Sequence, residues 1–235
     1  MTGTGTGVGK THVAAMIARA LAAEGRKVGV YKPAASGCSR DAHGALMSND
    51  AVALWEAAGR PGPIEKVCPQ LFAAPLAPHL AARAEGRTIN RDLLRWGIDY
   101  WRPKSDVIVI EGAGGLFSPL TDSDLNVDLA LEFGFPLVIV TANQLGAIHG
   151  TMATISGTYQ AFLRHLNRVA ISCVVLNNVD VCESDMSRDS NLSQLRHFTK
   201  ALKVVQLIEL PHQATTFTEP VDWFKLASYR PGFPH

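Results

Sequence analysis

The stretch Thr2-Gly3-Thr4-Gly5-Thr6-Gly7-Val8-Gly9-Lys10-Thr11 decides the fold, because its glycines stand directly ahead of an amphipathic segment, residues 11–24. Glycines let successive backbone N–H groups turn towards phosphate oxygens, and the N-terminus of the following helix adds the positive end of its dipole. We therefore expect Lys10 to reach the β- and γ-phosphates of a nucleotide and Thr11 to offer its hydroxyl to Mg²⁺. A flexible glycine-rich terminus is the alternative, which the Gly-Lys-Thr run at the helix start disfavours.

The loop has two unusual features. From Gly3 to Gly9 it is one residue longer than the ordinary phosphate-binding pattern, which would place a glycine where Thr4 stands. A phosphate loop also follows a buried strand, whereas only Met1 and Thr2 precede Gly3 in this sequence. We therefore expect a sheet that lacks its N-terminal strand.

Short β-branched apolar runs alternate with longer segments of helical spacing along the rest of the chain. Nearly continuous apolarity suits strands covered on both faces, and the alternation is typical of an open, mainly parallel α/β sheet flanked by helices, here of P-loop NTPase type. The expected strands are 27–32, 106–111, 136–142, 168–176 and 203–207. The expected helices are 11–24, 49–58, 90–101, 126–133, 148–166 and 186–202. Residues 60–79 are expected to form an excursion over the sheet, and the tail after Pro211 to be irregular.

Composition limits the class of protein. A chain of 235 residues with 47% hydrophobic and 18% charged residues predicts one globular domain, 1–235. Lys plus Arg number 22 against 21 Asp plus Glu, and this balance disfavours nucleic acid or a membrane as a partner. The four cysteines form no CxxC pair, and no apolar run approaches the roughly 20 residues that span a bilayer, so we expect reduced thiols and a cytoplasmic location.

Charged residues stand at or near the ends of predicted elements. Lys32 closes the strand 27–32, at the edge where open α/β sheets place ligands. A solvated surface lysine is the commoner interpretation, and the nearby loop favours an ammonium directed at phosphate. Glu111 closes the strand 106–111 and precedes Gly112-Ala113-Gly114-Gly115, which fits an acid that holds Mg²⁺ beside a nucleotide. Asp50, near a helix start, is either a first-turn acid that suits the helix dipole or a metal ligand.

Two asparagines mark the end of another predicted strand, and the histidines bear on metal binding. Asn177 and Asn178 close another strand, where a side-chain amide can pair with both the donor and the acceptor edges of adenine, although a plain turn fits equally well. The eight histidines show no HxH or HExxH spacing, which disfavours zinc. No Gly-x-Ser-x-Gly elbow is present, which disfavours serine-hydrolase chemistry.

In this order, the motifs resemble those of the dethiobiotin synthetase family. The likeness covers most of the chain and fades after Pro211. It rests on the glycine-rich loop with its extra residue, on Tyr31-Lys32-Pro33 with Ser36-Gly37, on Asn49-Asp50-Ala51, on Ala77-Pro78-His79, on Glu111-Gly112-Ala113-Gly114-Gly115, on Leu145-Gly146-Ala147-Ile148-His149 and on Leu176-Asn177-Asn178.

The resemblance implies an ATP- and Mg²⁺-dependent cyclo-ligase that works as a homodimer on small molecules. The expected reaction takes 7,8-diaminononanoate, CO₂ and ATP to dethiobiotin, ADP and phosphate. A substrate amine takes up CO₂ to form a carbamate, the carbamate attacks the γ-phosphate to give a carbamic–phosphoric anhydride, and the second amine closes the ureido ring. Such chemistry needs positioning and charge neutralisation rather than a protein nucleophile.

The resemblance also implies roles for individual residues. Lys10 and Lys32 would be catalytic and flank the transferring phosphoryl group and the carbamate. Mg²⁺ would be held by Thr11, Asp50 and Glu111. The nucleotide would be bound by Gly7, Val8, Gly9, Lys10, Thr11, His12, Asp50, Glu111, Gly112, Ala113, Gly114, Asn177 and Asn178. The substrate would be bound by Thr6 and Ser36 at the carbamate end and by His149, Gly150 and Thr151 at its distal carboxylate.

Three rival functions remain. A cobyrinic-acid-type amidotransferase synthetase should carry a glutaminase domain, for which 235 residues leave little room. A partition-type ATPase should carry a second Lys early in the loop, where this chain has Thr4, Gly5 and Thr6. A catalytically inactive nucleotide-binding module has no need of the lysines and acids that this chain retains.

Overall fold

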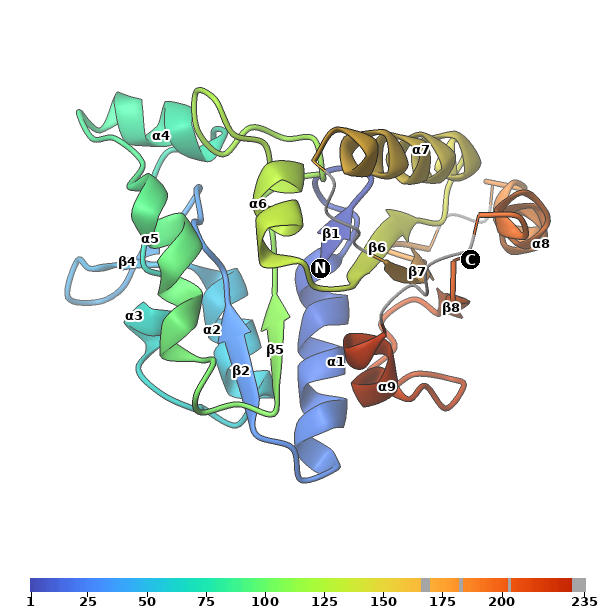
Figure 1. Ribbon diagram of the computed structural model, residues 1–235, viewed down its shortest axis with the longest axis horizontal. Coiled ribbons are helices and arrows are strands. Elements are labelled where there is room, and N and C mark those ends of the chain that lie inside the picture. Colours follow the sequence, from blue (N-terminus) through green and yellow to red (C-terminus); the bar gives the residue numbers. More distant parts are fainter. Residues whose placement is uncertain (166–169, 182–183, 203, 230–235) are drawn as a thin grey trace. The chain divides into compact units, whose positions relative to one another are not determined.

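The computed structural model describes residues 1–165, 170–181, 184–202 and 204–229. These residues form two compact units, which we name the loop unit, Met1–Lys10 with Ala130–His235, and the carboxylate unit, Thr11–Leu129. Each unit has its own parallel strands and its own helices (Figure 1). The predicted α/β class, with parallel strands flanked by helices, is confirmed; the single domain over 1–235 stays a prediction.

The sheet of the loop unit has the strand order β1-β6-β7-β8, and all of its neighbours are parallel. Its strands are β1 (Thr2–Gly3), β6 (Leu137–Ala142), β7 (Ile171–Asn177) and β8 (Gln206–Leu210). Every residue of β7 is buried, as its apolar sequence and its place between two neighbours require. The register aligns Ala142, Asn177 and Leu210, so the carboxyl ends of three strands meet at one edge.

The structure corrects the expectation about the start of the chain. We expected no strand ahead of the glycine-rich loop, and a short one is present: Thr2 pairs with Ile139, and Gly3 with Val140. The Thr4 N–H continues the ladder by donating to the Val140 carbonyl at 3.0 Å. Because backbone groups alone make these bonds, two residues are enough to align the start of the loop with the sheet.

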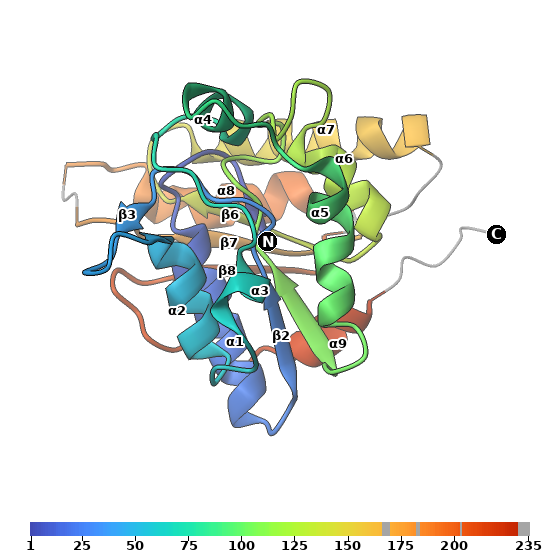
Figure 2. The ribbon, with the colours of Figure 1, turned by 90° about the vertical axis from the view of Figure 1, so that its left-hand side faces the viewer.

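In the described part of the chain, helices pack against several strands of the loop-unit sheet. These are α7 (Ala147–His165), which packs on β6, α8 (Arg188–Thr199), which packs on β8, and α9 (Trp223–Ser228), which packs on β7. Both ribbon views place α7 and α9 on opposite sides of the strands (Figure 1, Figure 2). The tail is thus more regular than expected, because Asp222 caps α9 by accepting from the Lys225 N–H and Trp223 is buried.

The carboxylate unit is built around two parallel strands and a small antiparallel pair. The parallel pair is β2 (Val28–Tyr31) with β5 (Val107–Ile110), and the antiparallel pair, which the sequence did not predict, is β3 (Ser39–Arg40) with β4 (Leu46–Met47). Its helices are α1 (Lys10–Ala23, whose first residue belongs to the loop unit), α2 (Asn49–Ala57), α3 (Ile64–Val67), α4 (Pro78–Ala84) and α5 (Arg91–Trp96). The helix α6 (Asn126–Phe133) continues past Leu129 into the loop unit.

The segment predicted as one helix over 90–101 is two pieces. The helix α5 ends at Trp96, and a 3₁₀ turn, Gly97–Tyr100, follows it. A Cβ atom on Gly97 would lie 2.3 Å from the hydroxyl oxygen of Tyr31, so only glycine fits against that ring. The Tyr31 hydroxyl in turn donates to the Leu93 carbonyl at 2.6 Å.

The remaining predicted elements match the observed ones to within a few residues. The excursion 60–79 contains α3 and reaches β-type pairing where Leu71 bridges Ala35. The predicted ends at 166, 168–169 and 203 lie outside the described residues. Among the residues that are described, no helix has the length and apolarity that crossing a membrane requires.

Candidate active site

The phosphate-binding loop of the loop unit connects β1 to α1. Gly7 and Gly9 have φ values of +76° and +87°, a region that favours glycine. Within the described part of the chain, the backbone N–H groups of residues 5–9 donate to no protein acceptor. The loop therefore presents a row of donors with the composition and conformation of an anion site. Lys10, only 7% exposed, folds back so that Nζ donates to the Gly5 carbonyl at 2.8 Å.

Asn177 and Asn178 lie at the carboxyl edge of the same sheet. The Asn177 side chain is buried and its Nδ2 donates to the Val8 carbonyl at 3.0 Å, so this residue contacts the loop itself. Asn178 Nδ2 donates to Glu209 Oε1 at 3.1 Å and to the Leu210 carbonyl at 3.0 Å. Contact of either residue with adenine stays a prediction.

The carboxylate unit brings four predicted residues together. Lys32 Nζ lies 2.8 Å from Glu111 Oε1 and 3.0 Å from Asp50 Oδ2. The Thr11 hydroxyl donates to the same Glu111 oxygen at 2.8 Å. These side chains come from the first turn of α1, the end of β2, the first turn of α2 and the end of β5. We call this set the lysine–carboxylate cluster.

Charge within the cluster is held away from water. Lys32 is 3% exposed and Glu111 is 1% exposed, so the lysine is not the solvated surface charge that its sequence context alone favoured. Burial by itself lowers the pKa of the Lys32 ammonium, but the negative charges of Glu111 and Asp50 outweigh burial and raise the pKa above its usual range. The ammonium therefore stays protonated at neutral pH.

The cluster also has the donor set that suits Mg²⁺. The second carboxylate oxygen of Glu111, Oε2, is buried and accepts from no group in the described chain. The Asp50 side chain is 49% exposed. Mg²⁺ is commonly bound by one or two carboxylates and a hydroxyl, with substrate phosphates and water as its other ligands. The described residues contain no group of three His, Cys, Asp or Glu that would hold a metal alone, so nucleotide and water would complete the shell.

Asn126 orders the glycine-rich segment after Glu111, and the sequence analysis missed it. Its Nδ2 donates to the carbonyls of Ala113, Gly115 and Ser118 at 2.7–3.1 Å, and its Oδ1 accepts from the Ala113 N–H at 3.1 Å. This segment, Gly112–Gly114, was predicted to bind nucleotide. An asparagine that starts a helix is so common that its sequence position gave no signal.

The other predicted contacts differ in exposure. Thr6 and His12 are exposed, Ser36 is half-buried, and His149 is exposed in the first turn of α7. Thr151, in the same turn, is fully buried and its hydroxyl has no partner in the described chain. Gly150 faces the loop, because a Cβ atom on it would lie 3.5 Å from the Cβ of Thr4.

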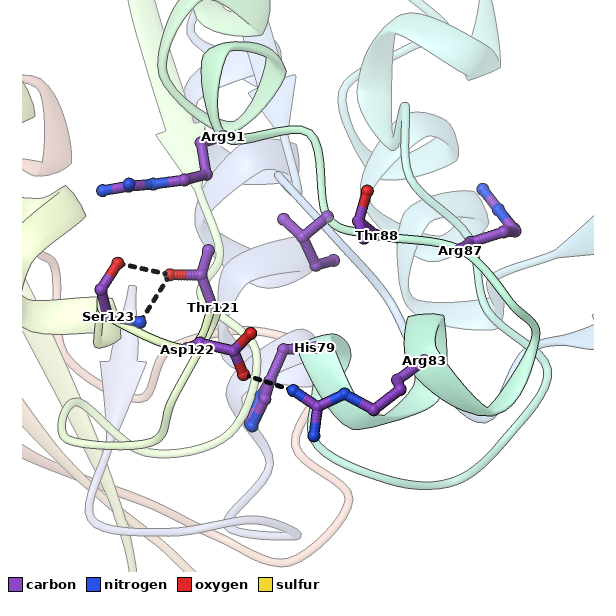
Figure 3. Close-up of a pocket in the computed structure, with 9 residues that line it drawn as sticks. His79, Arg83, Arg87, Thr88, Arg91, Thr121, Asp122 and Ser123 are labelled. Atoms are coloured by element: carbon purple, nitrogen blue, oxygen red, sulfur yellow. Dashed lines mark hydrogen bonds and ion pairs between the residues drawn. The ribbon is translucent and has the colours of Figure 1, made fainter.

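A separate hollow of about 290 Å³ lies in the carboxylate unit (Figure 3). Figure 3 shows Arg83 pointing towards Asp122. The guanidinium lies 2.8 Å from the carboxylate. Arg91 is paired with Asp124 and Arg87 with Glu85, so acids neutralise the cations of its wall. The lining contains none of the predicted nucleotide, metal or substrate residues. It consists of His79, Arg83, Arg87, Thr88, Ile89, Arg91, Thr121, Asp122 and Ser123.

Comparison with known proteins identifies relatives along most of the chain. A family model described as an AAA domain matches residues 1–217. A protein of Rhodopirellula baltica named ATP-dependent dethiobiotin synthetase BioD is 41% identical over 84% of this chain and 78% of its own length. Proteins with the same name from Anaeromyxobacter dehalogenans strain 2CP-C and Caulobacter vibrioides strain NA1000 / CB15N are 38% and 35% identical. They match 85% and 93% of this chain and 84% and 90% of their own lengths.

Among solved structures, a nucleotide-binding protein from Archaeoglobus fulgidus in complex with ADP aligns with 97% of this chain and 83% of its own. Its TM-score is 0.44 and its sequence identity is 13%, which is too distant a likeness to add to the argument.

Proposed function

The chain belongs to the dethiobiotin synthetase family and is an ATP-dependent ligase, and from this premise we propose that it converts 7,8-diaminononanoate, CO₂ and ATP into dethiobiotin, ADP and phosphate. Besides the family membership, one feature of this chain supports the proposal. In the lysine–carboxylate cluster, the protonated Lys32 ammonium contacts one oxygen of the buried Glu111 carboxylate, and the other oxygen has no partner in the described chain. A buried ion pair adds little to stability by itself, so the burial of these charges supports a role for them in the reaction.

The glycine-rich loop is assigned to the phosphates of ATP. The N–H groups of residues 5–9, which have no acceptor in the described chain, would donate to phosphate oxygens, and Lys10 would leave the Gly5 carbonyl to neutralise the β- and γ-phosphates. Asn177 Oδ1, which accepts from no group in the described chain, would accept from the adenine amino group, and Asn178 would line the same base.

Thr11, Asp50 and Glu111 are assigned to Mg²⁺. All three carry oxygen ligands, and Glu111 Oε2 is a buried oxygen that has no partner in the described part of the chain. Bound Mg²⁺ supplies neutralisation of the charge on the phosphate oxygens as the phosphoryl group transfers. Within the cluster, Glu111 keeps Oε1 on Lys32 and Thr11, which fixes the orientation of its carboxylate.

Lys32 is assigned to the reacting groups. Its ammonium would neutralise the substrate carbamate and the transferring phosphoryl oxygens, so that the carbamate oxygen attacks the γ-phosphate without electrostatic repulsion. Thr6 and Ser36 would hydrogen-bond the carbamate end. The carbamic–phosphoric anhydride then loses phosphate when the second amine attacks its carbonyl carbon and closes the ureido ring. No protein nucleophile takes part.

The distal carboxylate of the diamine is assigned to the start of α7, residues His149, Gly150 and Thr151, in a homodimer. The start of a helix carries the positive end of the dipole, which suits a carboxylate. The Gly150 N–H already donates to the Gly146 carbonyl at 3.0 Å, so Gly150 itself would offer no free backbone donor. The buried thiols of Cys38, Cys68 and Cys173 are unpaired, which supports a reducing, cytoplasmic location; Cys182 lies outside the described residues.

The proposal is tested by ADP release that depends on the diamine. The purified protein is incubated with ATP, Mg²⁺, bicarbonate and 7,8-diaminononanoate, ADP is followed continuously, and the product is identified by mass. We expect ADP and dethiobiotin in equal amounts, and neither when the diamine is omitted or when Lys10 is changed to Ala. ADP release that ignores the diamine would instead indicate an ATPase of another class.

A further inference from the structure

The phosphate loop is joined to the carboxyl edge of the sheet by a side chain. Asn177 is the last residue of β7, and its backbone is fixed by pairing with Ala142 on one side and Leu210 on the other. Its side chain is 4% exposed and donates from Nδ2 to the carbonyl of Val8 at 3.0 Å. A rigid strand end therefore holds one peptide group of an otherwise open loop.

The held peptide group is the one that matters for phosphate. The Val8 carbonyl and the Gly9 N–H belong to the same planar, trans peptide, so they point in opposite directions. When Asn177 holds the carbonyl on its side, the Gly9 N–H must face the other way. That N–H donates to no protein group in the described chain, so its direction is left for a ligand.

Gly9 shows that the contact is close. A Cβ atom on Gly9 would lie 2.1 Å from Asn177 Nδ2, and its φ of +87° is one that favours glycine. Any other residue at position 9 would push the amide away from the loop and strain the backbone at once. The glycine and the asparagine are thus matched to one another.

The remaining anchors of the loop hold other parts of it. The Thr4 N–H donates to the Val140 carbonyl at the loop's start, and Lys10 Nζ donates to the Gly5 carbonyl. Lys10 has to leave Gly5 if it is to neutralise phosphate, whereas Asn177 does not have to move. Asn177 can therefore hold the Val8–Gly9 peptide both with and without a bound nucleotide.

We infer that Asn177 is a positioning residue for phosphate binding: its amide orients the Val8–Gly9 peptide so that the Gly9 N–H is preset towards the β-phosphate. This rests on the proposed function, because it takes the loop to be the ATP-phosphate site. The inference goes beyond contact with adenine: Asn177 Nδ2 binds the loop, and Asn177 Oδ1 stays available to the base.

The experiment uses a ligand that has no base. Binding of inorganic tripolyphosphate with Mg²⁺, and of ATP, is measured by calorimetry for the parent and for Asn177→Ala. A lost hydrogen bond that preset a donor should weaken tripolyphosphate binding by about 5- to 20-fold. If Asn177 contacted only adenine, ATP binding would weaken and tripolyphosphate binding would stay at the parental value, which would overturn the inference.

Asn191→Ala is the matched control. Asn191 is another buried asparagine of the loop unit, and its Nδ2 bonds go to Asn143 and to the Gln144 carbonyl rather than to the loop. The Asn191→Ala substitution therefore removes a buried amide from the same unit, and we expect this variant to bind tripolyphosphate within twofold of the parent. An equal loss in both variants would mean general destabilisation and would also overturn the inference.

Two further measurements keep the test decisive. If Asn177→Ala does not fold, Asn177→Asp keeps the shape, removes the donor, and should lose at least as much affinity. In the protein without ligand, limited proteolysis within residues 2–12 should be faster in either Asn177 variant than in Asn191→Ala, because the loop has lost one of its anchors. Unchanged cleavage would contradict the anchor. A parent that bound neither ATP nor tripolyphosphate would instead refute the proposed function.

Discussion

The Lys32 ammonium lies 2.8 Å from Glu111 Oε1, at the ends of two neighbouring parallel strands, with both side chains buried. Parallel pairing in register places Tyr31 opposite Ile110, so the next residues along each strand meet at the same edge. The pairing of β2 with β5 therefore builds the ion pair. Each charge depends on the other, because a buried charge without a partner is strongly destabilising.

We predict that Lys32 and Glu111 are coupled in stability. Lys32→Met leaves a buried carboxylate facing one acid and no cation, and should lower the free energy of unfolding by about 3–5 kcal/mol. Lys32→Met with Glu111→Gln should lose much less than the sum of the two single losses, as measured by urea denaturation without Mg²⁺. Arg60→Met is the control, because its pair with Glu56 is exposed and should contribute at most about 1 kcal/mol. Strict additivity would show that the ion pair is energetically unimportant.

We predict that Glu111→Gln raises the Mg²⁺ requirement of diamine-dependent ADP release. A neutral amide is a poorer ligand for a hard cation, and losing even an outer-shell partner of a metal commonly costs about 10- to 100-fold. The half-saturating Mg²⁺ concentration should rise by at least about tenfold, in line with that range. Glu65→Gln, an exposed acid of α3, should leave the titration where it is in the parent. An unchanged titration for Glu111→Gln would give Glu111 a structural role only.

Much of this arrangement was predictable from the sequence, and the reason is local. The strands β2, β5, β6 and β7 are continuous apolar runs, and Lys32 and Glu111 interrupt the apolarity just where a strand ends. Parallel strands end at one edge, so the sequence placed each charge at a strand end where ligands bind; the direct ion pair between them was not predicted.

The features that the sequence did not predict are either contacts between distant residues or elements too short to detect. The bond from Asn177 to Val8 joins residues 169 positions apart, and nothing local distinguishes that asparagine from one in a turn. The short helices α3 and α4 lie in a proline-rich stretch, where helical spacing is too brief to detect. The two-residue β1 needs only backbone groups, so its side chains carry no strand signal.

We predict that the buried thiols are unreactive in the folded protein. Burial raises the pKa of Cys68 to about 12, and burial likewise raises the pKa of Cys38 and of Cys173. The thiolate is the reactive form, so almost none is present at pH 8. With a disulfide reagent at pH 8, no more than one of the four cysteines should react quickly, and all four should react in denaturant. Fast modification of Cys68, located by peptide mass mapping, would contradict its burial.

We predict that Asp124 contributes acid-sensitive stability. Burial alone would raise the pKa of this carboxyl, but hydrogen bonds from Thr121, Arg91 and Arg95 outweigh burial and lower it. A lowered pKa means that the contribution is present at neutral pH and is lost as the pH falls through the folded-state pKa. Asp124→Asn should lose about 1–3 kcal/mol at pH 7, and the difference from the parent should shrink towards pH 3. Asp122→Asn, at an exposed pair, should change stability by less than about 0.5 kcal/mol at either pH.

The last prediction concerns the catalytic part assigned to Lys32. If its ammonium neutralises charge that develops on the carbamate and the transferring phosphoryl oxygens, its effect is largest in the transition state. Lys32→Ala should then lower kcat by about 10²–10³, with ATP affinity close to the parental value. ATP affinity and single-turnover formation of dethiobiotin are measured on one preparation, at a temperature where circular dichroism shows the variant to be folded. Lys32→Arg tests whether a positive charge at this place is enough for catalysis. The wider guanidinium keeps the charge but not the position between Glu111 and Asp50, so the rate of Lys32→Arg should fall between those of the parent and Lys32→Ala. A rate loss matched by an equal loss of ATP affinity would make Lys32 a ground-state contact of the nucleotide, because an interaction made equally in both states changes binding and leaves the chemical step as it was.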